Sequence, residues 1–397
     1  MLHSCLRALF AIALAVSAWA IALPALAHPG ESAALVAGGF HNCARLNDGT
    51  VRCWGDNFDG QLGDGGSTDR LTPVAVSGLA NATALVAGHF HTCALLTDGT
   101  VRCWGDNWYG QLGDGSNTDR LTPVAVSGLA NVTALAAGGY HTCALLSDGT
   151  VRCWGYNSWG QLGDGTSVDR RTPVAVSGLA NATALAGGSE HSCALLTDAT
   201  VRCWGNNVNG QLGDGSSTWR LTPVAVSGLA NAMALAAGFD HSCALLTDGT
   251  LRCWGKNFVG QLGDGSTTGR LTPVAVVGPT DATALALGGD HSCALLTDGT
   301  MRCWGANAYG QIGDGTTTQR RWATVVSGLA NVAALLAGTH HTCAQLNDGA
   351  VSCWGRNSDG QLGDGTTTQR TLPTPVIDTP FITIHVFSDG FEGGLRR

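Results

Sequence analysis

Short apolar stretches separated by glycine-rich polar segments recur along almost the whole chain. In one representative unit these stretches cover residues 83–87, 91–96, 101–104 and 123–126. Apolar runs of this length, bounded by Gly, Pro and Asp, are typical of strands, and no segment has the 3.6-residue spacing of an amphipathic helix. The pattern therefore predicts four short strands per unit and excludes a two-helix repeat.

The second and third strands of this unit flank an Asp-Gly turn at residues 97–100. A three-residue hairpin loop that ends on a glycine in the left-handed region suits this sequence. Counting outward along the two strands then pairs Leu95 with Val101 and Cys93 with Cys103. Directly opposed residues of antiparallel strands lie about 4.5–5.5 Å apart, so this register brings the two cysteines together.

The unit repeats seven times without a gap when the sequence is aligned with itself at a shift of 50 residues. A four-stranded sheet cannot bury both of its faces alone, whereas sheets packed radially around an axis bury one another and leave few free edges. The expected fold is all-β, a seven-bladed β-propeller spanning residues 28–378. Its repeats cover about 34–83, 84–133, 134–183, 184–233, 234–283, 284–333 and 334–378.

The two ends of the chain do not follow the repeat. Residues 1–27 combine Arg7, an apolar run and an Ala-Leu-Ala site after Pro24, which together predict a secretory signal peptide cleaved before His28. An uncleaved anchor helix is the alternative, and no later segment is apolar for long enough to span a membrane. The tail, residues 379–397, is expected to be either a flexible end or a sorting signal.

Composition narrows the possible partners. Of 397 residues, 57 are Gly and only 13% are charged, and Lys256 is the single lysine. Removal of residues 1–27 leaves 20 basic and 29 acidic side chains, a net charge of −9. Such a surface does not suit a phosphate backbone or an anionic membrane, so neither nucleic acid nor lipid is an expected partner. The glycines of residues 60–65 lack the lysine and helix of a nucleotide loop, and no cofactor is expected.

Fourteen cysteines form seven pairs, and the two members of each pair are ten residues apart across the predicted hairpin. In an oxidising compartment this geometry predicts seven disulfides within the blades. Zinc bound by His91, Cys93 and Cys103 is one alternative, although the close Cys-x-x-Cys spacing of many zinc sites is missing, and reduced buried thiols are the other. The pairs are Cys43 and Cys53, Cys93 and Cys103, Cys143 and Cys153, Cys193 and Cys203, Cys243 and Cys253, Cys293 and Cys303, and Cys343 and Cys353.

Residues that occur in every unit are expected to serve the scaffold, because a protein rarely needs seven identical catalytic groups. His41 and its six equivalents are interpreted as structural hydrogen-bonding groups, and Trp54 and its equivalents as packing between blades. Asp64 and Arg70 are expected to form an ion pair within or between blades. No Ser-His-Asp set and no pair of close carboxylates stands out from the repeat, so neither a catalytic residue nor a metal site is predicted.

Candidate binding residues are therefore sought where the units differ. Two variable positions directly precede the repeated His and two follow the Trp-Gly-x-Asn motif, and many of them carry aromatic side chains on otherwise polar loops. Aromatic loop residues with acidic neighbours are typical of protein interfaces, and such rings also stack on sugars. The alternative is that they pack against neighbouring blades. The candidates are Phe40, Phe58, Phe90, Trp108, Tyr109, Tyr140, Trp159, Trp219, Phe239, Phe258 and Tyr309.

The string HTCALLTDGTVRCWGDNWYGQLGDG, residues 91–115, resembles the repeat of the regulator of chromosome condensation family. The resemblance covers nearly the whole chain after residue 27. The cysteine-containing form resembles a secreted bacterial branch of the family, which includes alpha-tubulin-suppressor-like repeat proteins. The resemblance implies a seven-bladed propeller. Propellers of this family usually close by mixing both chain ends in one blade, which implies that Pro373–Ile377 pairs near Ala34–Ala37.

The resemblance implies a scaffold but not a particular partner. The nucleotide exchange and chromatin binding of the family's eukaryotic founder do not carry over to a secreted acidic chain. A secreted inhibitor of beta-lactamase in the family implies that this scaffold can present aromatic loops to an extracellular protein. We expect a monomeric secreted, periplasmic or cell-surface scaffold without enzyme activity, which binds an extracellular or envelope protein. Carbohydrate binding is the first alternative, and a lyase or hydrolase with its site at the channel mouth is the second.

Overall fold

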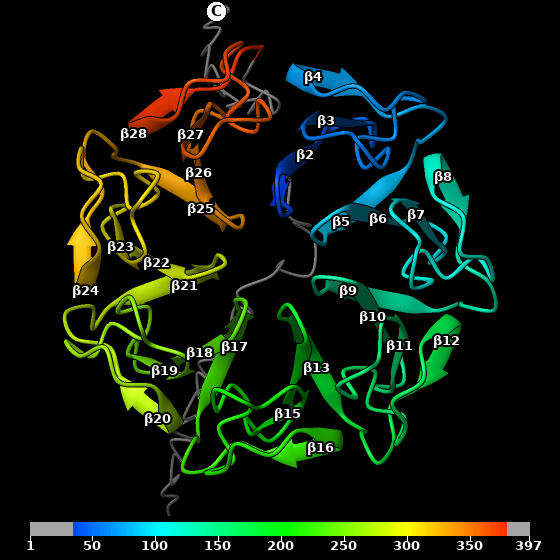
Figure 1. Ribbon diagram of the computed structural model, residues 1–397, viewed down its shortest axis with the longest axis horizontal. Helices are drawn as coiled ribbons and strands as arrows, with labels where there is room; N and C mark the ends of the chain where they lie inside the picture. Colours follow the sequence, from blue (N-terminus) through cyan, green and yellow to red (C-terminus); the bar gives the residue numbers. More distant parts are fainter. Residues whose placement is uncertain (1–34, 379–397) are drawn as a thin grey trace, which may run out of the picture.

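The computed structural model describes residues 35–378. They form 28 strands in seven four-stranded antiparallel sheets, which are arranged around a central axis as the blades of a propeller (Figure 1). This arrangement confirms the predicted all-β, seven-bladed fold. Within the described range no helix is long and apolar enough to cross a membrane. The expected signal peptide, residues 1–27, and the tail, residues 379–397, lie outside the described residues.

Each blade contains four strands that are consecutive in the sequence and follow one another from the axis to the perimeter (Figure 1). The innermost strands are β1 (Leu35–Ala37), β5 (Ala82–Ala87), β9 (Val132–Ala137), β13 (Ala182–Gly187), β17 (Ala232–Ala237), β21 (Ala282–Leu287) and β25 (Val332–Ala337). The second strands are β2 (His41–Arg45), β6 (His91–Leu96), β10 (His141–Leu146), β14 (His191–Leu196), β18 (His241–Leu246), β22 (His291–Leu296) and β26 (His341–Leu346).

The third strands are β3 (Val51–Gly55), β7 (Val101–Gly105), β11 (Val151–Gly155), β15 (Val201–Gly205), β19 (Leu251–Gly255), β23 (Met301–Gly305) and β27 (Val351–Gly355). The outer strands are β4 (Arg70–Ala75), β8 (Arg120–Ala125), β12 (Arg170–Ala175), β16 (Arg220–Ala225), β20 (Arg270–Ala275), β24 (Arg320–Val325) and β28 (Arg370–Pro375). The second and third strands are the most buried, because both of their faces are covered by neighbouring blades.

Hairpins between the second and third strands follow the predicted register. Cys93 lies opposite Cys103 in the second blade, and the other six blades pair their cysteines in the same way. Gly99 adopts the left-handed conformation (φ 76°) that ends the three-residue loop. In the fourth blade this position is Ala199, which keeps the same conformation (φ 61°) without the freedom of glycine.

Neighbouring blades share a hydrophobic core in which the repeated tryptophan lies beside the cysteines of the preceding blade. Trp104 of the second blade is fully buried in one cluster with Cys43 and Cys53 of the first. The same combination occurs at every junction, and Trp54 joins the cysteines of the seventh blade. Gly63 must lack a side chain, because a Cβ there would lie 2.8 Å from Nε1 of Trp104. The tryptophans therefore pack between blades, as predicted.

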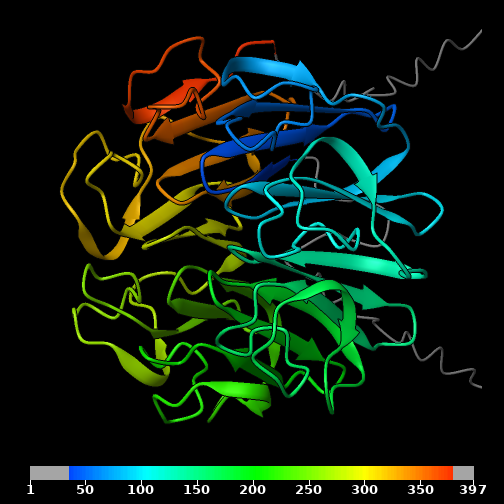
Figure 2. The ribbon, with the colours of Figure 1, turned by 45° about the vertical axis from the view of Figure 1, so that its right-hand side comes forward.

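The expected mixing of both chain ends in one blade is wrong for the described residues. β28 pairs with β27 of its own blade, and β1 pairs with β2. β1 is the innermost strand of its sheet and β28 is the outermost of its own, so these two strands do not meet. The first blade (blue) instead packs beside the seventh (orange to red) as one complete sheet against another (Figures 1 and 2). The repeat is in phase with the blades, and no strand has to be exchanged.

Hydrogen bonds between backbones of adjacent blades close the ring at two radii. Near the axis the Gly39 N–H donates to the Gly88 carbonyl at 3.0 Å, and the Thr339 N–H donates to the Gly39 carbonyl at 3.3 Å. At each of the five junctions between them, one N–H donates to the next blade in the same way. Near the perimeter the Gly65 N–H donates to the Leu121 carbonyl at 3.0 Å, with an equivalent bond at each of the other six junctions. The junction between the seventh and first blades is thus built like the others.

Candidate binding face

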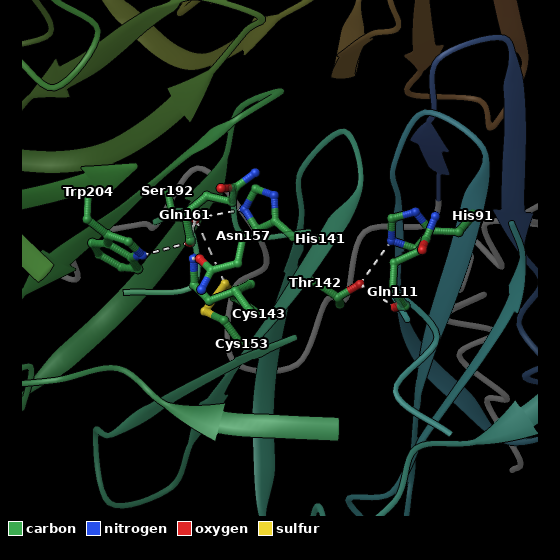
Figure 3. Close-up of a disulfide and its surroundings, with 11 residues drawn as sticks. His91, Gln111, His141, Thr142, Cys143, Cys153, Asn157, Gln161, Ser192 and Trp204 are labelled. Carbon is green, nitrogen blue, oxygen red and sulfur yellow. Dashed lines mark hydrogen bonds between the residues drawn. A yellow bond between two sulfur atoms is a disulfide. The ribbon is translucent and has the colours of Figure 1, made fainter. Parts of the chain in front are cut away.

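The repeated histidine links each blade to the next. In Figure 3, Nε2 of His141 lies 2.8 Å from the Ser192 hydroxyl of the following blade. That hydroxyl donates to the Gln161 carbonyl at 2.9 Å, and the same carbonyl accepts a bond from Nε1 of Trp204 at 2.8 Å. Six of the seven junctions have this arrangement, with Ser or Thr as the hydroxyl. The histidines and tryptophans therefore belong to one inter-blade network.

This network determines the protonation of the histidines. A hydroxyl has one proton, and Ser192 donates it to the Gln161 carbonyl, so Nε2 of His141 must carry the proton of the bond between them. Nδ1 of His141 is buried and has no hydrogen-bond partner among the described residues. Burial, and next the neighbouring His191, lower the pKa of His141 to about 3. The repeated histidines, one in each blade, are consequently neutral at physiological pH. They are structural groups, as interpreted from the sequence.

The seventh junction uses an amide in place of the hydroxyl. Nε2 of His341 lies 3.0 Å from Oδ1 of Asn42, and Nδ2 of Asn42 donates to the Gln361 carbonyl at 2.7 Å. The asparagine amide accepts through Oδ1 and donates through Nδ2, so it reproduces the role of the hydroxyl with two atoms in place of one. The one departure from Ser or Thr at this position thus lies where the first and last repeats meet.

The cysteines and the Asp–Arg pairs also belong to the scaffold. The two sulfur atoms of every pair lie 2.01–2.10 Å apart, which is the length of a disulfide bond, and each cysteine is at most 3% exposed. Asp64 and Arg70 form an ion pair within the blade, and all seven equivalents have N–O distances of 2.5–2.8 Å. Asp64 also accepts a bond from the Asn57 amide, so the pair organises the long loop.

One end of the propeller, here called the loop face, is formed by the turns between the first and second strands and by the long connections between the third and fourth. In the first blade these segments are residues 38–40 and 56–69. Antiparallel pairing places them side by side, and the Asp56 N–H donates to the Phe40 carbonyl at 3.0 Å. All eleven aromatic candidates belong to these two segments or their equivalents. The fold therefore brings them to one face of the molecule.

Several candidates form a continuous row of rings, here called the aromatic arc. Ring centroids lie 5.9 Å apart for Phe40 and Phe90, 6.1 Å for Phe90 and Tyr140, and 5.7 Å for Tyr140 and Tyr109. These distances are in the range of favourable aromatic pairs. The arc extends from Tyr109 to Tyr156 at 4.7 Å, and from Phe40 through His340 to Tyr309 at 6.4 and 5.1 Å. All of its members are half-buried.

The other candidates lie outside this arc. Phe58 and Trp108 are the most exposed, with 81% and 75% of their surface accessible, and Phe258 is also exposed. Trp159 meets Trp219 edge to face at 5.9 Å. Phe239 contacts His89 at 5.0 Å, and both residues line a cavity of about 160 Å³ on the axis. The candidates thus divide into rings that pack against one another and rings that face solvent.

The position before the repeated histidine divides the loop face into two halves. It is aromatic or His in four blades and acidic in the other three, where it is Glu190, Asp240 and Asp290. Lys256 Nζ lies between the two aspartates, 3.6 Å from Asp240 and 3.2 Å from Asp290. Asn206 donates to Glu190 at 2.8 Å. The acidic half is therefore largely satisfied by its own polar neighbours.

A cluster of carboxylates between the first and second blades was not found in the sequence. Burial, and then the nearby charges of Asp106, Asp119 and Asp56, raise the pKa of Asp59 to about 6. Burial also raises the pKa of Asp56 and of Asp106. These carboxylates come from two blades, and Asp56 and Asp106 are 50 residues apart in the sequence. The residue after Trp-Gly, which varies from Asp to Tyr, Asn, Lys, Ala and Arg, was the signal that could have indicated them.

Known protein families match this chain along its repeats. The RCC1-like domain matches residues 130–391, which is more than half of the chain. Two forms of the regulator of chromosome condensation (RCC1) repeat match residues 48–95 and 98–145, and residues 33–61 and 82–111. The chain belongs to the RCC1 family. Each matched RCC1 repeat of 48 residues contains the outer two strands of one blade and the inner two of the next, as residues 48–95 cover β3, β4, β5 and β6.

Solved RCC1 structures share the propeller. Yeast RCC1 (Prp20), in a structure with Kap60 bound, has a TM-score of 0.75 and 25% identity, over 83% of each chain. Prp20p from Saccharomyces cerevisiae, studied for its binding to Gsp1p and histones, has a TM-score of 0.73 and 25% identity, over 83% of this chain and 86% of that one. Human WBSCR16 shows the same fold at a TM-score of 0.71 and 23% identity, over 79% and 86%. A comparison with curated protein sequences finds no match.

Proposed function

We propose that this RCC1-family protein is a secreted, non-enzymatic and monomeric scaffold whose loop face binds another protein. The observation that carries the proposal is the position of the variable aromatic residues. Blades that are otherwise nearly identical differ mainly in aromatic residues on one face, and Trp322 in β24 is the one variable ring of the described residues outside it. Exposed aromatic side chains on loops of a rigid scaffold are typical anchors of protein interfaces. The yeast relative, Prp20, also binds proteins.

The proposed location outside the cytoplasm is supported by the cysteines. Fourteen of them lie in seven pairs at bonding distance, and disulfides persist in oxidising compartments. The signal peptide expected at residues 1–27 agrees with this location. We therefore propose an envelope, cell-surface or extracellular protein as the partner.

The test is capture of partners from an envelope extract by the purified protein and by a variant in which Phe58, Trp108 and Trp159 are changed to Ala. We expect the wild type to retain a protein that the triple variant loses. A control variant carries Val277→Ala, Trp322→Ala and Val325→Ala, which removes exposed apolar side chains outside the loop face. Equal capture by all three proteins would contradict the proposal.

Carbohydrate binding is the second candidate, because the exposed ring of Trp108 and the Trp159–Trp219 pair also suit the flat face of a sugar. A glycan array separates the two functions. Retention of one glycan class by the wild type, and its loss in the Trp108→Ala variant, would favour the sugar. Cleavage of that glycan would point instead to an enzyme, with the coupled carboxyls Asp59 and Asp106 as the groups to change first.

A further inference from the structure

The loop face already binds one of its own cations through aromatic rings. The guanidinium carbon of Arg356 lies 4.9 Å from the ring centroid of Phe40 and 5.8 Å from that of Tyr309. The same guanidinium is 3.8 Å from a carboxylate oxygen of Asp359. Cations over aromatic faces are attracted by the negative face of the ring, and a nearby carboxylate adds to the attraction. Arg356 of the seventh blade is thus held by a ring of the first blade, a ring of the sixth and a carboxylate of its own loop.

The carboxylates between the first and second blades have no such cation. The loop of Asp56 and Asp59 lies against the start of the loop of Asp106, because the Gln61 carbonyl accepts a hydrogen bond from Nε1 of Trp104 at 2.9 Å and Oε1 of Gln61 accepts one from the Asp59 N–H at 3.0 Å. None of these three aspartates forms an ion pair with a lysine or arginine in the part of the chain that the structure describes. Phe58 and Trp108, the two most exposed aromatic residues of the loop face, belong to the same two loops. The hydrogen bonds that Asp106 accepts, from the Trp108 N–H at 2.9 Å and the Gln111 amide at 2.7 Å, come from neutral donors. The arrangement therefore combines exposed rings with carboxylates that have no cationic partner among the described residues.

We propose that this surface, defined as Asp56, Phe58, Asp59, Asp106 and Trp108, binds an arginine-bearing segment of a protein partner. The inference deepens the proposed function and rests on it. A guanidinium can stack its plane on an exposed ring while its N–H groups donate to carboxylates, which an ammonium cannot do. Arg356 shows the ring contact within the same molecule, with Asp359 at 3.8 Å, while its Nε–H donates to the Ser358 hydroxyl at 2.8 Å.

Charge separates this occupant from the others. An apolar segment or a neutral sugar over Trp108 would bury the three aspartates without a counter-charge, which is costly. An arginine compensates them as it binds. The net charge of −9 that remains without residues 1–27 also attracts a basic partner and repels an acidic one.

The test measures the affinity of the purified full chain for three synthetic peptides in which Gly alternates with Arg, Lys or Glu, at 50 and 300 mM salt. We expect the Arg peptide to bind most tightly, the Lys peptide more weakly and the Glu peptide not at all. The double variant Asp59→Asn, Asp106→Asn should lose about tenfold or more in affinity for the Arg peptide, and Trp108→Ala a similar factor. A tenfold loss corresponds to about 1.4 kcal/mol.

A matched control removes the same charge from the opposite end of the propeller. Asp98→Asn together with Asp148→Asn changes two exposed hairpin aspartates and should leave the affinity within about twofold. Unfolding midpoints of all variants show whether they are folded, and Asp59→Glu keeps the charge if the Asn variant is unstable. An equal loss of affinity for the Arg peptide in both double variants would show that only the net charge of the protein matters, and would overturn the proposal. So would absence of Arg-peptide binding at 50 mM salt. If the extract experiment still shows loop-dependent capture, only this inference fails.

Discussion

Ala199 tests how strictly the hairpin of a blade requires glycine. Six blades have Gly at the end of this loop, and the fourth has Ala at φ 61°. A side chain in the left-handed region costs about 1 kcal/mol, because Cβ approaches the following carbonyl. We expect Ala199→Gly to raise the free energy of unfolding by about that amount. The change is measured as a shift of the guanidinium chloride midpoint with the disulfides intact.

The same loop in the second blade supplies the control. Gly99→Ala introduces the strain that Ala199→Gly removes, so it should lower the midpoint by a similar amount. The two positions lie in different blades, and the double variant should therefore be close to the wild type. Destabilisation by Ala199→Gly, or stabilisation by Gly99→Ala, would show that alanine is not strained in this loop.

Local spacing made some residue pairs predictable and left others hidden. The sequence separation of ten between Cys93 and Cys103 determines their opposition, because the register of the hairpin is counted outward from its turn. The contact of His91 with Thr142 spans 51 residues and depends on the angle between two blades. The electrostatic interaction of Asp59 with Asp106 likewise joins two blades and depends on how they pack. The aromatic candidates could be placed on loops, but not in an arc, for the same reason.

The hairpin is the element that the cysteines are expected to stabilise. If all seven pairs are oxidised, the mass of the purified protein increases on reduction by two hydrogens for each pair. A double variant, Cys143→Ser with Cys153→Ser, should lower the free energy of unfolding by about 2.5–3 kcal/mol, because an 11-residue loop in the unfolded chain is released. Intact mass spectrometry and chemical unfolding check the two outcomes.

Zinc and free thiols predict different results for that experiment. A chelator would lower the stability of a metal-bound hairpin and would leave a disulfide unchanged. An iodoacetamide adduct on the unfolded but unreduced protein would reveal free thiols. No mass change on reduction would contradict the disulfides, and with them the main support for a location outside the cytoplasm.

The order of strands within a blade could be predicted from the sequence. The residue at which one blade ends and the next begins could not. The turn at residues 97–100 and the first three strands follow from short-range pattern, and the structure agrees with them to within one residue. The fourth strand was predicted at residues 123–126, whereas β8 covers Arg120–Ala125. Where one blade ends depends on whether the chain ends share a sheet, and the repeat itself is silent on this point. Here β1 pairs with β2 and β28 with β27, so each sheet is continuous in sequence. The closing interactions are side-by-side contacts, including the Asn42 bridge.

At the scale of the whole molecule, the seven buried histidines are expected to make stability depend on pH. Burial lowers the pKa of six of them to about 3 and that of His241 to about 4, from an ordinary value of 6.5. At a pH between the lowered pKa values and 6.5, these histidines bind protons in the unfolded chain but not in the folded propeller. The free energy of unfolding should therefore be fully present above pH 6.5, decrease as pH falls below it, and stop decreasing near pH 3–4. Each histidine contributes up to about 1.4 kcal/mol per pH unit.

The slope of this dependence distinguishes proton binding from a general loss of stability. In His191→Gln the amide can still donate to Ser242, the partner of His191 in the wild type, but it does not titrate. The variant should be less stable at every pH, because its packing is worse. Its unfolding free energy between pH 6 and pH 5 should also fall less steeply than that of the wild type, by about one proton. Chemical unfolding at half-unit steps from pH 7.5 to pH 5 gives both quantities. If the two slopes are equal, the repeated histidines are not responsible for the acid sensitivity, because a purely structural defect displaces the curve without changing its slope.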